Sequence, residues 1–105
     1  MSIAYARLRA ALASGDLDFI RFHARELPAI RLGDALRICL LMRDQDPERY
    51  EQAALRWIGR FALEARTATL ADVRMAADAL GRLPSEADNA MTVLQRLCLN
   101  HGLGD

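Results

Sequence analysis

The segment that decides the fold runs from Asp46 to Ala65 and reads DPERYEQAALRWIGRFALEA. It opens with a carboxylate, a proline and a second acid, which are the residues that favour the start of a helix. Projected at about 100° per residue, its apolar residues fall on one broad side. They are Tyr50, Ala53, Ala54, Trp57, Ile58, Phe61, Ala62 and Ala65. We therefore predict a helix over residues 47–65 in the middle of the protein, with Trp57 pointing inward.

The segment before it predicts a second central helix, over residues 32–45. Apolar side chains would occupy most of the circumference of this helix, as expected for an element with neighbours on several sides. They are Leu32, Ala35, Leu36, Ile38, Cys39, Leu40, Leu41 and Met42.

Four further helices with a single apolar stripe are predicted, over residues 2–13, 16–27, 69–82 and from about 84 to 102. Ser2, Asp16 and Thr69 would act as N-caps, and Gly102 would end the last helix. In the helix over 69–82 we expect a buried stripe opposite a solvated ladder of Arg74, Asp78 and Arg82. That stripe consists of Leu70, Val73, Ala76, Ala77 and Leu80.

Short turns join these segments, and no linker separates them. The pattern predicts an all-α fold: one helical domain over residues 1–105, a compact bundle of about six helices. The helices near 32–45 and 47–65 would be central. The arrangement would be either orthogonal or a stack of helical hairpins.

The composition is that of an ordinary globular protein, with 52% apolar and 27% charged residues among 105. Fourteen basic and fourteen acidic residues cancel, so no overall field attracts nucleic acid or anionic lipid. The longest apolar run, Ile38 to Met42, is too short to span a membrane. Two distant cysteines without a signal sequence predict a cytoplasmic protein with reduced thiols.

The residues that usually perform catalysis are sparse. There are two histidines, and neither a nucleophile elbow nor a phosphate-binding Gly-rich loop is present. We therefore expect a protein that is not an enzyme and uses no cofactor. Cys98 and His101 lie three positions apart, and Cys39 with His23 could complete a tetrahedral zinc site. Because zinc ligands normally come in closely spaced pairs, we expect no metal.

Arg49, Arg56 and Arg60 form a ridge on the helix over 47–65, within about 40° of one another. Like charges at i,i+4 repel, so something should compensate them. Glu64 or carboxylates on a neighbouring helix would form an internal network with the ridge. A bound phosphate or nucleic-acid backbone is the alternative. The neutral chain favours the internal network.

Four apolar residues fall off the main stripe of their helix, so some of them should be exposed, and two or more that cluster would form a surface for protein contact. They are Phe22, Leu41, Met75 and Leu99. Residues 1–31 hold five arginines and three acids, whereas residues 67–105 hold three and five, which favours self-association. Our leading hypothesis is a non-enzymatic helical protein-interaction module that forms a homo-oligomer, with a symmetric dimer expected. The alternative is a nucleic-acid or phosphate-binding accessory protein that uses the ridge.

Four short stretches carry a family resemblance. They are DALRI from Asp34, DPERY from Asp46, ALRW from Ala54 and LAD from Leu70. Together they resemble a set of short, Arg-, Ala- and Leu-rich helical proteins of high-GC actinobacteria, over roughly residues 32–83. The resemblance implies an all-helical fold in a bacterial cytoplasm. It implies no activity and assigns no site residue.

Overall fold

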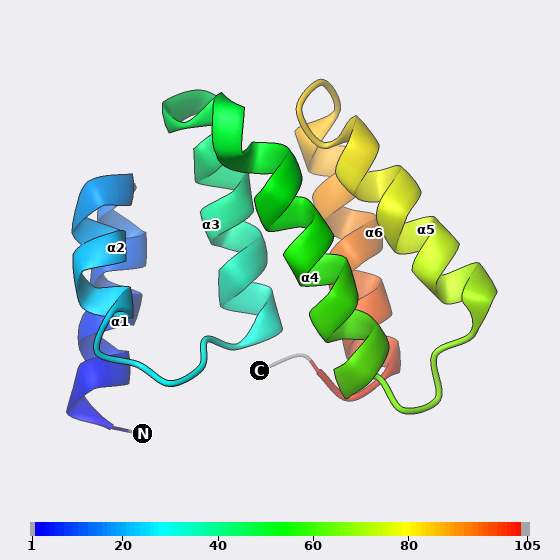
Figure 1. Ribbon diagram of the computed structural model, residues 1–105, viewed down its shortest axis with the longest axis horizontal. Coiled ribbons are helices and arrows are strands. Elements are labelled where there is room, and N and C mark those ends of the chain that lie inside the picture. Colours follow the sequence, from blue (N-terminus) through cyan, green and yellow to red (C-terminus); the bar gives the residue numbers. More distant parts are fainter. Residues whose placement is uncertain (1, 104–105) are drawn as a thin grey trace.

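Six α-helices and one turn of 3-10 helix make up residues 2–103, the part of the chain described by this computed structural model (Figure 1). The first three helices are α1 (Ile3–Ser14), α2 (Leu17–Ala24) and α3 (Leu32–Gln45). The 3-10 turn η1 (Pro47–Arg49) leads into α4 (Tyr50–Glu64). The chain continues through α5 (Leu70–Arg82) and α6 (Ala87–Asn100). The all-helical fold expected from the sequence is confirmed.

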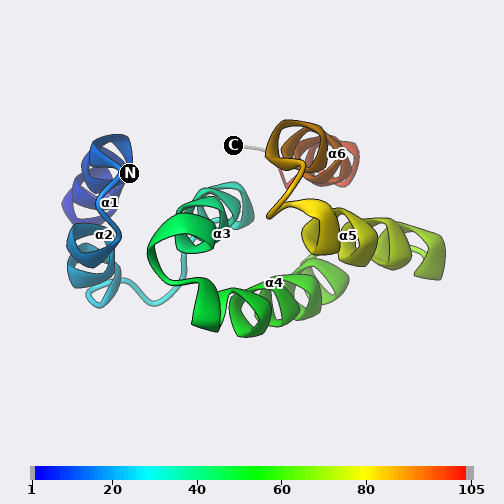
Figure 2. The same ribbon diagram turned by 90° about the horizontal axis from the view of Figure 1, so that it is seen from above.

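The helices pack as stacked hairpins, α1 on α2, α3 on α4 and α5 on α6. Figure 2 shows two rows, with α1, α3 and α6 in one and α2, α4 and α5 in the other. Helix α3 contacts α1, α2, α4 and α6, while α4 lies between α3 and α5. These two helices are therefore central, as predicted. The Cα radius of gyration of 13.3 Å matches the value of about 13 Å expected for a compact domain of this length.

Capping residues place several helix ends where the sequence predicts them. The Ser2 side chain accepts a hydrogen bond from the Tyr5 N–H at 3.1 Å, and Asp16 caps α2. Thr69 and Asp72 form a reciprocal capping box at the start of α5. Gly15, which ends α1, adopts a φ of 72° in the left-handed region that glycine tolerates best.

Three helix ends differ from the prediction. Helix α2 ends at Ala24 rather than near Leu27, because the following N–H groups bond three residues back in a tighter turn. Helix α6 begins at Ala87, after a turn that contains Pro84. Asp46 makes no side-chain cap, since its carboxylate pairs with arginines instead.

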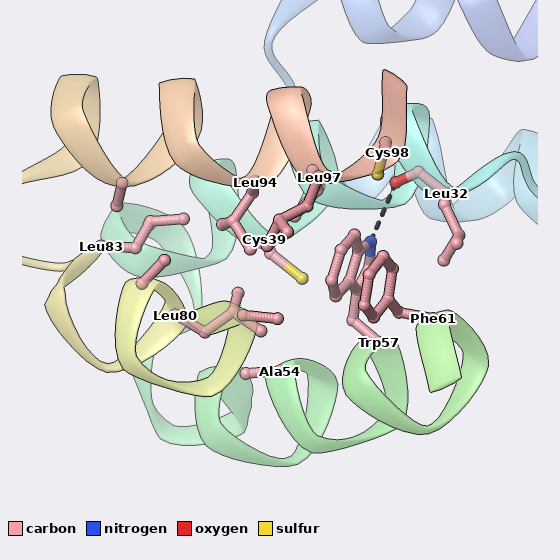
Figure 3. Close-up of a cluster of buried hydrophobic side chains, with 14 of the residues drawn as sticks. Leu32, Cys39, Ala54, Trp57, Phe61, Leu80, Leu83, Leu94, Leu97 and Cys98 are labelled. Atoms are coloured by element: carbon pink, nitrogen blue, oxygen red, sulfur yellow. Dashed lines mark hydrogen bonds between the residues drawn. The ribbon is translucent and has the colours of Figure 1, made fainter. Parts of the chain in front are cut away.

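Trp57 lies in the centre of the main core, with 2% of its surface exposed. Its indole N–H donates to the Leu32 carbonyl at 2.9 Å (Figure 3). The indole stacks on the Phe61 ring at a centroid distance of 5.5 Å and an angle of 7°. Leucines from α3, α5, α6 and the turn after α5 belong to the same buried cluster, so the inward tryptophan is confirmed.

The N-terminal hairpin has a smaller core of its own, made of Tyr5, Leu8, Ala11, Leu12 and Ile20. Leu41, one of the four off-stripe residues, is half-buried and packs against both cores. Gln45 also joins the hairpin to the rest of the protein. Its side chain accepts from the Leu17 N–H at 2.9 Å and donates to the Gly15 carbonyl at 2.7 Å.

The buried side of α5 is narrower than predicted. Leu70 is 85% exposed and Ala77 is also exposed, whereas the buried residues are Ala76, Ala79 and Leu80. Helix α5 packs on α4 and α6, so side chains about 100° or more from Ala76 reach solvent. On α4, Ala62 is exposed for the same reason.

Within residues 2–103, the longest apolar helical stretches fall short of what is needed to cross a membrane.

Candidate functional site

A groove lies where α2, α3 and α4 meet, and we call it the Arg-rimmed groove. It consists of two adjoining hollows that share Ile38, Ala53 and Arg56. Its floor is apolar, and four guanidinium groups line it. The floor residues are Ala35, Ile38, Cys39, Met42, Ala53 and Trp57, and the arginines are Arg21, Arg49, Arg56 and Arg60.

The groove follows from how the helices pack. Helix α2 packs mainly on α1 and α3, which leaves the arginine-bearing side of α4 uncovered. Ala35 on α3 and Ala53 on α4 contribute only methyl groups, so these two helices do not fill the space beside them. The three arginines of the predicted ridge therefore border one surface, and Arg21 of α2 joins them.

Carboxylates compensate three of the four arginines. Asp46 lies 2.6 Å from the guanidinium of Arg21 and 3.7 Å from that of Arg49. Glu64 accepts from Arg60 at 2.9 Å. Arg56 is exposed and makes no ion pair or hydrogen bond with any other residue between 2 and 103. The predicted internal network thus exists for Arg49 and Arg60, and Arg56 remains outside it.

The groove offers little that could drive a reaction. Cys39 is 3% exposed, and burial raises the pKa of its thiol to about 11. A protonated, buried thiol is a poor nucleophile near neutral pH. Asp46, the carboxylate that pairs with Arg21 and Arg49 of the groove, is held by both arginines. The arrangement is suited to binding an apolar group next to an anion.

The other predicted contact residues do not form one patch. Phe22, Met75 and Leu99 are 59%, 50% and 67% exposed. Phe22 lies on α2 and Met75 on α5, at opposite ends of the molecule (Figure 1). Leu99 borders a separate hollow between α3 and α6. Leu41 is half-buried, so three of the four residues are exposed, as expected for some of them, and they lie on three different helices.

The sequence analysis did not identify several other apolar residues that are exposed. Leu55, Leu63 and Leu70 are 63%, 84% and 85% exposed. Leu55 and Leu63 both fall outside the predicted buried side of the helix over 47–65. Their position around the helix was therefore a sequence signal that they are exposed. Ile3 and Phe19 are further exposed apolar residues near the N-terminus.

A second polar cluster joins the start of α5 to the end of α6. Thr67 Oγ1 lies 3.0 Å from His101 Nδ1, and His101 Nε2 lies 3.2 Å from Asp72 Oδ2. This order of groups resembles a nucleophilic relay, but Asp72 also accepts the Thr69 N–H within the capping box. The cluster does not border the Arg-rimmed groove, and it acts as a structural tie.

The four residues considered for zinc occupy different surroundings. Cys39 and Cys98 are buried in the main core, and His23 contacts the rings of Phe19 and Phe22 on α2. Among residues 2–103, no group of three or more His, Cys, Asp or Glu side chains could hold a metal ion.

Comparisons with protein-family models, with curated proteins and with solved structures found no match to this chain. The resemblance to actinobacterial helical proteins therefore stays a prediction.

Proposed function

We propose that this protein is a non-enzymatic helical interaction module. Its Arg-rimmed groove binds a segment of a partner protein in which an acidic residue stands next to apolar residues. The observation that carries the proposal is Arg56, an exposed guanidinium without an acidic partner among residues 2–103, beside the apolar floor of Ile38 and Ala53. We place this activity in a bacterial cytoplasm as part of the same proposal.

The chemistry of the groove favours a carboxylate and aliphatic groups together. A guanidinium offers a planar pair of donors that fits a carboxylate, and hydrogen bonds to charged groups contribute about 1.5–3 kcal/mol each. Arginine is also enriched in protein interfaces, whose centres are apolar. A partner segment with Asp or Glu next to Leu, Ile or Phe would satisfy Arg56 and cover Ile38 at once.

Nucleic acid is the weaker candidate. Phosphate binding gains from several uncompensated cations, and here Arg21, Arg49 and Arg60 already have carboxylate partners. Single-stranded nucleic acid also needs exposed aromatic rings on which bases stack. The aromatic ring of the groove, Trp57, is 2% exposed. The net charge of the chain is zero.

The test is selection from a random-peptide display library, followed by fluorescence anisotropy on an enriched peptide. We expect enriched sequences that combine an acid with large aliphatic or aromatic residues. Arg56→Glu should weaken binding on the order of 10- to 100-fold, as the loss of one charge-assisted contact implies. Arg96→Glu, which reverses an exposed arginine on α6, is the matched control and should leave binding unchanged.

Two results would overturn the proposal. One is binding that Arg56→Glu and Arg96→Glu affect equally. The other is salt-sensitive binding of a 30-nucleotide strand that Arg56→Glu abolishes while no peptide is enriched, which would establish the nucleic-acid alternative.

A further inference from the structure

A second surface, on the outer side of α4 and α5, is largely apolar with the exposed Arg74 at its α5 edge, and we call it the α4–α5 face. Its residues are Leu55, Ile58 and Ala62 of α4 together with Leu70, Ala77 and Gly81 of α5. A hollow runs between the two helices beside Leu55, Ile58, Ala77 and Gly81. By projection, Ala62 lies between Ile58 and Leu55 around α4, and Leu70 lies between Ala77 and Gly81 around α5.

The two ends of this face carry opposite charges. Glu51 lies in the first turn of α4, and Arg66 lies in the loop between α4 and α5. Both are exposed, and neither has an ion-pair partner among residues 2–103. The Tyr50 hydroxyl donates to the Leu80 carbonyl at 2.7 Å, which fixes the start of α4 beside the end of α5. One end of the face is therefore acidic and the other is basic.

The face is close to symmetric about its midpoint. Ile58 lies seven residues after Glu51 and eight before Arg66 of the following loop, and Ala77 of α5 lies midway between Leu70 and Pro84. A two-fold axis through Ile58 and Ala77 would bring the Glu51 of each copy opposite the Arg66 of the other. An isologous dimer requires this kind of self-complementarity.

We infer that the α4–α5 face docks a second copy of this chain, antiparallel about a two-fold axis through Ile58 and Ala77, with two Glu51–Arg66 ion pairs between the copies. The small side chains of Ala62, Ala77 and Gly81 let the helices approach closely, and Leu55 and Leu70 are covered. The inference is independent of the proposed function, because Arg56 points roughly 100° or more away from Leu55 and Ile58 around α4.

The size of the face sets the expected affinity. Helix α4 has 15 residues and is roughly 22 Å long, and two packed helices are roughly 20 Å wide. The resulting footprint of roughly 400 Å² per copy is below the 800 Å² or so of a standard stable interface. Interfaces this small belong to weak, transient complexes, so we expect the dimer to form only at concentrations on the order of micromolar to millimolar.

Charge reversal with analytical ultracentrifugation tests the inference. The wild-type chain should pass from monomer to dimer as its concentration rises through that range. Glu51→Arg alone and Arg66→Glu alone should each be monomeric. In either variant, both symmetry-related contacts between residues 51 and 66 would join two like charges. An equimolar mixture of these two variants should form a heterodimer, because both cross-contacts are then attractive. The double variant Glu51→Arg with Arg66→Glu should recover the homodimer.

Ala77→Glu is a further variant, because it places two carboxylates together on the axis and should abolish the dimer. Circular dichroism melts establish that each variant folds, which is expected for exposed positions. A wild-type chain that stays monomeric at millimolar concentration overturns the inference. So does a dimer that persists in Ala77→Glu, or single charge variants that fail to associate when mixed.

Discussion

The phenol oxygen of Tyr5 lies 2.6 Å from Oδ2 of Asp34, and this contact joins α1 to the first turn of α3. The same oxygen accepts the Arg31 N–H at 2.9 Å. Asp34 is 2% exposed and is the charged side chain that residues 2–103 bury. Burial, with the Asp34 hydrogen bond second, raises the pKa of Tyr5, so the phenol remains a donor.

Replacing this donor tests how far the contact stabilises the fold. Tyr5→Phe leaves a buried carboxylate oxygen and the Arg31 N–H without their partner. We expect the free energy of unfolding to fall by about 1–3 kcal/mol, measured by urea denaturation. Adding Asp34→Asn to the Tyr5→Phe variant should recover part of the loss, because an amide costs less to bury than a carboxylate. A change below about 0.5 kcal/mol in Tyr5→Phe would contradict the assignment.

Trp57 and Arg74 should differ sharply in their effect on stability. Trp57→Ala empties the centre of the main core and should lower the free energy of unfolding by about 3–5 kcal/mol. Arg74→Ala, at an exposed position on α5, should cost less than about 1 kcal/mol. Trp57→Phe keeps an aromatic ring in the core but removes the hydrogen bond to Leu32 and part of the volume, so it should cost less than Trp57→Ala. Denaturant melts in which Arg74→Ala is the more damaging change would refute this placement of the helix faces.

The buried phenol and thiols predict a loss of stability in alkali. Burial raises the pKa of Tyr50 to about 12, and it raises the pKa of Cys39 and of Cys98 to about 11. Since these pKa values are higher in the folded than in the unfolded chain, the stabilisation is complete below pH 9 or so and disappears as pH rises toward 12. We expect the urea midpoint to fall between pH 8 and pH 11.

Tyr50→Phe provides the control for this dependence. It removes the hydroxyl that donates to Leu80, so it should be less stable at pH 8. It should lose less additional stability than the wild type above pH 10, because one titrating group is gone. Parallel pH profiles for the two proteins would contradict the role given to Tyr50.

Asp72 predicts a loss of stability at acidic pH. The Thr69 backbone N–H is the main cause that lowers the pKa of this carboxylate, and His101 contributes. A pKa that is lower in the folded state stabilises the protein fully above about pH 4, and this stabilisation is lost as pH falls below that value and through the lower pKa of the folded state. Asp72→Asn should therefore melt at a lower temperature than wild type at pH 7, and the gap should shrink at pH 3. An equal gap at both pH values would count against this role.

The central helices could be read from the sequence because their signals are local. The spacing of Trp57, Phe61 and Tyr50 places them on one side of a helix, whatever lies beyond it. Helix starts at Ser2, Asp16 and Thr69 were equally readable, since a cap bonds to N–H groups within three residues.

The features that escaped prediction depend on contacts between distant segments. Asp46 reads as a helix cap, but the docked N-terminal hairpin brings Arg21 to it. Leu70 lies on the apolar stripe of its helix, but no helix within residues 2–103 covers its side of α5. The ridge arginines were identified from their spacing. That Arg56 would be left without a carboxylate could be learned only from the positions of Asp46 and Glu64.

The separate core of the N-terminal hairpin also has a dynamic consequence. The hairpin has its own buried cluster and is tied to α3 through Gln45 and Asp34, with Leu17 in the main core, and we expect it to open before the remaining helices unfold. Amide hydrogens of α1 and α2 should then exchange with deuterium sooner than those at the centre of α3. Such opening would remove Arg21 from the Arg-rimmed groove, so the proposed ligand is expected to favour the closed hairpin. A bound segment should slow exchange in a hairpin that it barely touches.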